Sequence, residues 1–89
     1  MENLNQEERT IIAEFVFSNQ TDVLIKSDVI KLIELFFKQD VIDAKTKDQL
    51  IKEVNSNSIG IVDKVNQLLD SKIDKKQGKA IMNEYYGGN

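Results

Sequence analysis

The apolar residues of this chain recur at the spacing of helix faces rather than with the alternation of strands. The first stripe covers Ile11–Val16, and Asn5 and Glu8 precede it at the three-residue spacing of a capping box. In a capping box each side chain accepts from the backbone N–H of the other residue, so a helix begins there. The pattern therefore predicts a first helix that ends near Ser18–Gln20.

The most apolar stretch of the chain follows an ambiguous segment. Thr21–Lys26 combines β-branched residues with a threonine that can cap a helix, so strand, helix turn and loop all stay open. From Asp28 onward the pattern is helical, and apolar residues over Val29–Phe37 cover more than one stripe. We expect this second helix to be the central and most enclosed one.

Two polar breaks divide the rest of the chain. A turn at Asp40–Asp43 leads into a third helix, for which the sequence offers two caps: Asp43 itself, or Thr46 three residues before Gln49. Asn55–Ser58 is the second break, because short polar residues favour turns and caps.

Two further helices are predicted after the second break. The apolar stripe over Ile61–Leu69 has i, i+1, i+4, i+7, i+8 spacing. Asp74 and Gln77 lie at capping distance and begin a fifth helix. Gly87–Gly88 is a typical helix end.

Val29–Val54 and Ile61–Tyr85 align with each other across a one-residue gap. Each is a helix, a turn with an Ile-Asp pair and a second helix. The Ile would enter the core, and the Asp would cap the next helix. True repetition would give two helical hairpins plus an N-terminal helix. The competing explanation is chance, because any two amphipathic hairpins align their apolar positions.

These signals predict an all-α fold, a compact bundle of four to five short helices. The length of 89 residues allows one domain, over 1–89, with frayed ends at about 1–4 and 87–89. No run approaches the ~18 apolar residues of a membrane span. The acidic N-terminus does not resemble a signal peptide, so we expect a cytoplasmic protein without a membrane partner.

The composition argues against catalysis. The chain has no His and no Cys, and its serines lack the flanking glycines of a nucleophile elbow. Asp40, Asp43 and Asp48 lack the spacing of a calcium loop, and helix capping explains them more simply. We therefore expect no enzyme activity, no catalytic residue, no metal and no cofactor.

The net charge of −3 conceals an asymmetry between the two halves of the chain. Residues 1–44 hold four basic and nine acidic side chains, whereas residues 45–89 hold eight and six. In the second half, lysines at helical spacing followed by tyrosines suggest a basic face for nucleic acid: Lys72, Lys75, Lys76, Lys79, Tyr85 and Tyr86. A solvated helix face explains the same lysines, and the scarcity of Arg favours that explanation.

The acidic half also holds more large apolar residues than five short helices can enclose. Phe17 lies off the first stripe, and either Phe36 or Phe37 must point away from the core. Such residues either pack under Thr21–Lys26 or form a patch for a partner or a second copy. The leading hypothesis is a small adaptor, inhibitor or immunity-type protein that binds another protein or itself through Glu7, Glu8, Glu14, Phe17, Phe36 and Phe37. The alternative is a DNA-binding regulator that uses the basic face.

Overall fold

In the computed structural model, which describes residues 3–21 and 24–87, the chain forms five α-helices and no strand. The helices are α1 (Gln6–Gln20), α2 (Lys26–Lys38), α3 (Ala44–Asn55), α4 (Ile61–Lys72) and α5 (Lys75–Tyr86). The all-α prediction is confirmed for this part of the chain. Residues 3, 4 and 87 lie outside the helices, and the remaining predicted frayed ends, 1–2 and 88–89, lie outside the described residues.

The predicted caps of α1 and α5 are confirmed. Asn5 Oδ1 accepts from the N–H of Glu8 at 2.8 Å, and Glu8 Oε1 accepts from the N–H of Asn5 at 2.9 Å. Asp74 Oδ1 accepts from the N–H of Gln77 at 2.7 Å. The C-terminal end of α5 is Gly87 at φ +79°, a conformation that glycine adopts without strain.

Of the two caps offered for α3, the structure uses Asp43. Its carboxylate accepts from the N–H of Thr46 at 2.8 Å, so Thr46 lies inside the first turn. The start predicted at Thr46 is therefore wrong. Helix α2 also begins earlier than Asp28, at Lys26, after extended backbone at Ile25. Residues 22 and 23 of the ambiguous segment lie outside the described residues.

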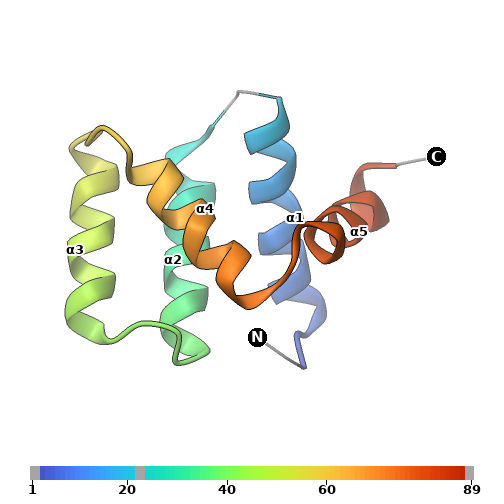
Figure 1. Cartoon of the computed structure of the whole chain (residues 1–89), viewed down its shortest axis with the longest axis horizontal. Coiled ribbons are helices and arrows are strands. Elements are labelled where there is room, and N and C mark those ends of the chain that lie inside the picture. Colours follow the sequence, from blue (N-terminus) through green and yellow to red (C-terminus); the bar gives the residue numbers. More distant parts are fainter. Residues whose placement is uncertain (1–2, 22–23, 88–89) are drawn as a thin grey trace.

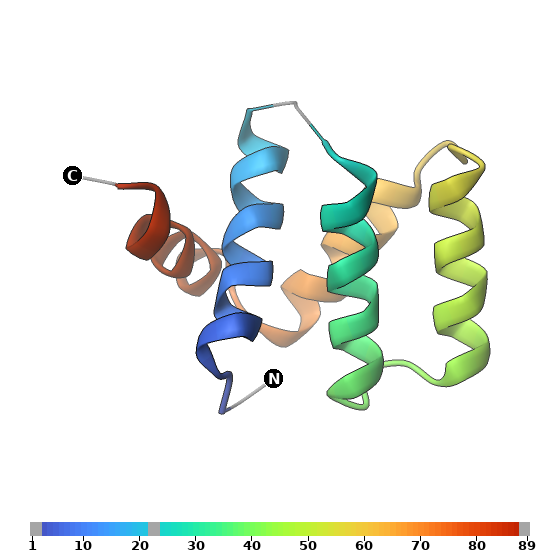
Figure 2. The same cartoon turned by 180° about the vertical axis from the view of Figure 1, so that it is seen from behind.

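Helices α1, α2 and α3 lie side by side in one layer, as Figures 1 and 2 show from its two faces. Helix α4 crosses one face of the layer over α2, and α5 lies across the outer side of α1 (Figure 1). With α1 and α3 beside it and α4 across it, α2 is enclosed on several sides. Its buried apolar residues are Val29, Leu32, Ile33, Leu35 and Phe36. The prediction of a central second helix is confirmed.

The two aligned stretches differ in how their helices pack. Helices α2 and α3 form an antiparallel hairpin, but α5 packs on α1 and makes few contacts with α4. The expected turn is shared in part: Asp43 and Asp74 both cap a helix, but Ile73 is buried in the core whereas Ile42 is only half-buried. A second hairpin is thus not formed, since the extended backbone of Ile73 redirects the chain toward α1.

Candidate protein-binding surfaces

A groove of about 500 Å³ lies between α1 and α2, and we call it the acidic groove. Ile11 and Leu35 contribute apolar lining. The charged lining consists of Glu7, Glu8, Glu14, Glu34, Lys31 and Lys38. The two helices that form the groove therefore contribute four carboxylates and two ammonium groups to its lining.

The acidic groove opens on the face of the helix layer that α4 leaves uncovered. Val29 of α2 lines a separate pocket together with Ile61 of α4. Lys31 lies two residues after Val29, about 200° around the helix, and so on the opposite side of α2. Figure 2 shows this uncovered side, with α4 behind the layer.

Glu8 belongs to the fold rather than to the open surface of the groove. It is only 4% exposed, and besides its capping bonds it accepts from Gln39 Nε2 at 3.0 Å and pairs with Lys38 at 3.5 Å. The Asn5 backbone N–H lowers the pKa of the Glu8 carboxyl below its ordinary value, against the opposing effect of burial, and Gln39 and Lys38 lower this pKa further. The structure thus removes Glu8 from the expected contact residues.

The other three carboxylates of the groove are free to meet a partner. Glu7 and Glu34 are exposed and Glu14 is half-buried. None of them forms a hydrogen bond or ion pair with any residue between 3 and 21 or between 24 and 87. A cation placed in the groove would therefore not have to displace an internal partner of these groups.

The three candidate phenylalanines do not form one surface. Phe36 is fully buried in the core, so it cannot touch a partner, whereas Phe37 is 40% exposed beneath the Lys47 ammonium at 4.6 Å. Phe17 is 38% exposed and stacks on Tyr86, with ring centroids 4.2 Å apart. Because α1 and α2 run antiparallel, Phe17 and Phe37 lie at opposite ends of the layer (Figure 1).

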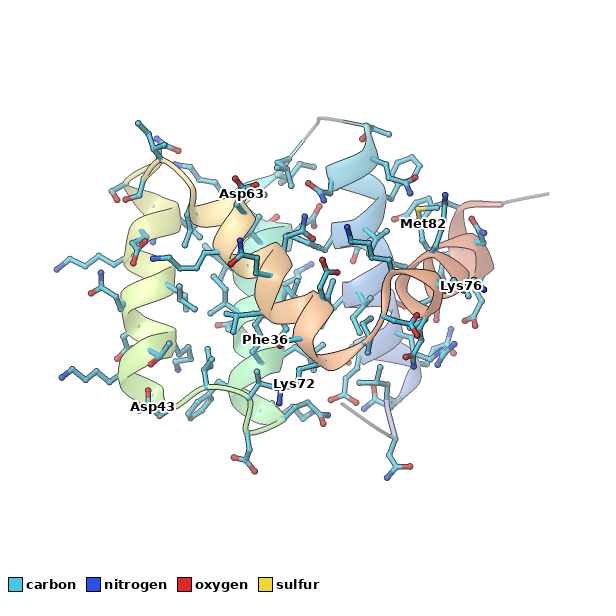
Figure 3. All side chains as sticks on the ribbon, viewed as in Figure 1. Phe36, Asp43, Asp63, Lys72, Lys76 and Met82 are labelled. Carbon is cyan, nitrogen blue, oxygen red and sulfur yellow. The ribbon has the colours of Figure 1, made fainter. Side chains whose placement is uncertain are left out.

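The predicted basic face is divided between two helices. Lys72 ends α4, whereas Lys75, Lys76 and Lys79 belong to α5, and Figure 3 shows Lys72 and Lys76 well apart. The expectation of four lysines on one helix face is therefore wrong. The break at Asp74, a helix cap, is its physical cause.

Both tyrosines turn toward α1 rather than toward the lysines. Tyr85 is half-buried, and its hydroxyl donates to the Gln6 carbonyl at 3.5 Å. Burial raises the pKa of Tyr86, and the negative charges of Glu14 and Asp28 raise this pKa further. The structure does not bring the lysines and tyrosines together as a nucleic-acid platform.

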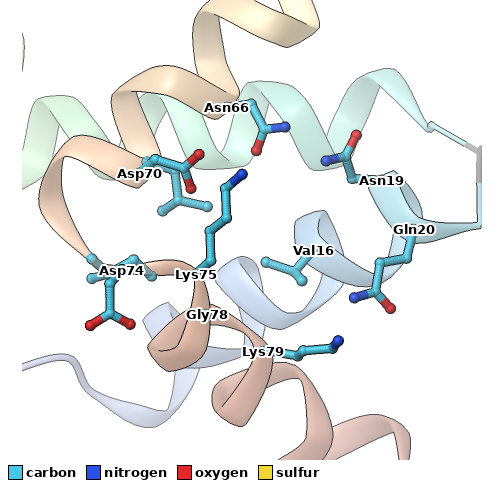
Figure 4. A pocket seen from close by; sticks show the side chains of 11 residues that line it. Val16, Asn19, Gln20, Asn66, Asp70, Asp74, Lys75, Gly78 and Lys79 are labelled. Atoms are coloured by element: carbon cyan, nitrogen blue, oxygen red, sulfur yellow. The ribbon is translucent and has the colours of Figure 1, made fainter.

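A second groove, of about 280 Å³, lies where α1, α4 and α5 meet, and we call it the Gly78 groove (Figure 4). Val16, Leu69, Ile73 and Gly78 provide its apolar lining. Its polar lining consists of Asn19, Gln20, Asn66, Asp70, Asp74, Lys75 and Lys79.

The sequence does not single out the side-chain amides of this groove. Asn19 and Gln20 belong to α1 whereas Asn66 belongs to α4, 46 residues after Gln20, and nothing in their local pattern pairs them. One local signal was present, because Gly78 interrupts the amphipathic pattern of α5. A lone glycine inside a helix normally has a packing or functional reason.

Comparison of the chain with protein families, curated proteins and solved structures gave no match. Among the described residues, no helix is long and apolar enough to pass through a bilayer. The same residues contain no cluster of three or more side chains of the kinds that hold metal ions. The geometry of the two grooves therefore has to support any functional conclusion by itself.

Proposed function

We propose that this chain acts by binding another protein, as an adaptor, inhibitor or immunity-type protein, without catalysing a reaction. The acidic groove is the observation that supports this most strongly. It combines an apolar floor of Ile11 and Leu35 with three carboxylates that have no partner among the residues that the structure describes. Charged walls around an apolar floor are typical of surfaces that accept a peptide or a helix.

A basic amphipathic helix is the partner that matches this groove. Two antiparallel helices leave a trough in which a third helix can lie, with its apolar side on Ile11 and Leu35. Its lysines or arginines would then meet Glu7, Glu14 and Glu34. The acidic balance of residues 1–44 also favours approach of a basic protein.

Nucleic acid, the alternative expected from the sequence, has less support. Lys75 and Lys79 share their groove with Asp70 and Asp74, and these carboxylates repel phosphate.

The proposal is tested with a synthetic helix that carries lysines on one side and leucines on the other. We expect the peptide to bind, and a twin with glutamates in place of the lysines not to bind. In the triple variant Glu7→Gln, Glu14→Gln, Glu34→Gln, binding should weaken at least about tenfold, a loss of about 1.4 kcal/mol. Isothermal titration calorimetry measures both, and higher salt should weaken the wild-type complex because exposed charges are screened.

The matched control is the triple variant Asp48→Asn, Asp63→Asn, Asp70→Asn. It changes the net charge by the same amount as the groove variant, but its substitutions lie on α3 and α4. It should bind the peptide like the wild type. Equal weakening in both triple variants would reduce the effect to general charge attraction and overturn the proposal. Circular dichroism confirms that each variant is folded.

A further inference from the structure

Gly78 of α5 is a glycine that the fold itself does not require. It is the fourth residue of the helix, and its N–H donates to the Asp74 carbonyl at 3.0 Å, so its backbone is in the helical ladder. A methyl group there would lie 3.7 Å from both Ile73 Cδ1 and Val16 Cγ2, which is ordinary contact. Alanine would therefore fit, and it favours helix more than glycine does. What glycine retains is the space between Val16 and Ile73.

That space belongs to the Gly78 groove, whose walls carry unused hydrogen-bonding groups. The side-chain amides of Asn19, Gln20 and Asn66 form no hydrogen bond with any of the residues that the structure describes. Each amide offers both donors and an acceptor. A peptide backbone, which presents alternating N–H and C=O groups, is the natural complement of such a wall.

The groove carries charges of both signs. In Figure 4, Asp74 lies at the end formed by the α4–α5 turn and Lys79 at the end nearer Gln20, whereas the Lys75 side chain extends toward Asp70 and Asn66. Neither Asp70 nor Lys79 forms an ion pair within the described residues. Because two carboxylates and two ammonium groups line the groove, a ligand with both a positive and a negative group fits it better than one that carries only negative charge.

We propose that the Gly78 groove binds a short extended peptide segment of a partner protein. Its backbone meets the amides of Asn19, Gln20 and Asn66, and a small side chain fills the space over Gly78. An acidic residue of the segment lies toward Lys79, and a basic one lies toward the turn at Asp74. This site is separate from the acidic groove, and it does not depend on the function proposed for that groove.

Two five-residue peptides with blocked ends serve as probes. One has a lysine first, then alanine, valine and alanine, and a glutamate last; the other has the reverse order. Titration of the ¹⁵N-labelled full chain is followed by nuclear magnetic resonance. We expect one of the two orders to shift the backbone signal of Gly78 and the side-chain amide signals of Asn19, Gln20 and Asn66.

The decisive variant is Gly78→Ala, which fills the floor and should weaken binding at least about tenfold while the melting temperature holds or rises. Lys79→Gln should also weaken binding, whereas Lys76→Gln, a neighbour on α5 outside the groove, should not. The triple variant of the acidic groove should bind the five-residue peptide with the affinity of the wild type. The two proposals can therefore fail independently of each other.

Three results would overturn the peptide proposal. The first is the absence of a Gly78 shift with both peptides at millimolar concentration. The second is unchanged affinity in Gly78→Ala. The third is an equal set of shifts with inorganic phosphate, which would make the groove an anion site instead.

Discussion

Glu8 joins the beginning of α1 to the end of α2 through one carboxylate. It closes the capping box with Asn5, accepts from Gln39 and pairs with Lys38. Because these groups lower the pKa of Glu8, its ionised form stabilises the folded chain above the pKa of the unfolded state. That contribution is lost as the pH falls through the folded pKa.

We therefore expect Glu8→Gln to be less stable than the wild type at pH 7, and this difference to shrink as the pH falls through the lowered folded-state pKa of Glu8. Urea unfolding at a series of pH values measures the difference. Glu7→Gln provides the control, because the Glu7 carboxylate has no partner within residues 3–21 and 24–87, and its stability should stay close to that of the wild type throughout the series. A Glu8→Gln deficit that stays constant from pH 7 to pH 3 would contradict the electrostatic explanation.

For single residues, the sequence predicts whether a side chain is buried or exposed only where local periodicity determines burial. It identified Phe17 as lying off its stripe, and it required one of Phe36 and Phe37 to face outward. The structure confirms both expectations, with Phe37 as the outward residue. The sequence alone could not show that Glu8 is buried, because Gln39 and Lys38 reach it from another helix.

Among the helices, α5 depends most on a single neighbour, α1. The stack of Phe17 on Tyr86, with planes 12° apart, ties the C-terminal end of α5 to α1. We expect a double-mutant cycle with Phe17→Ala and Tyr86→Ala to give a coupling energy of about 0.5–1.5 kcal/mol. Chemical denaturation of the four proteins measures it.

Phe37 supplies the matched control for this cycle. It is 40% exposed against 38% for Phe17, but it lies at the other end of the layer. Phe37→Ala and Tyr86→Ala should therefore be additive within about 0.5 kcal/mol. Additivity in the Phe17 cycle as well would show that the stack contributes no coupling.

The prediction of elements succeeded where hydrogen bonds are local and failed where packing is not. The caps at Asn5, Asp43 and Asp74 each use a partner three residues away, so the sequence displays them directly. Whether α5 returns to α4 or crosses to α1 depends on which apolar faces meet after the break at Ile73. The amphipathic pattern of α5 allows both, and the Gly78 groove exists only because α1 was the partner.

On the scale of the whole molecule, one end of the bundle exposes apolar side chains. The beginning of α2 and the α3–α4 turn both lie at this end (Figure 1). Leu24 and Ile25 directly precede α2, and Ile59 of the turn is fully exposed. Leu24 also lines a pocket of about 240 Å³ with Ser58 and Ile61, the residues that flank the Ile59–Gly60 turn.

A projecting isoleucine beside an apolar pocket can be self-complementary, because a two-fold axis at this end would bring the Ile59 of each copy to the pocket of the other. We expect the wild type to self-associate as its concentration rises, and Ile59→Ser to remain a single chain. Since Ile59 buries nothing within its own chain, the substitution should change unfolding stability by no more than about 0.5 kcal/mol. Phe37→Ser, with its exposed ring at the opposite end, is the control and should associate like the wild type. Sedimentation velocity distinguishes these outcomes. If the wild type stays a single chain at millimolar concentration, a second copy does not bind at this end.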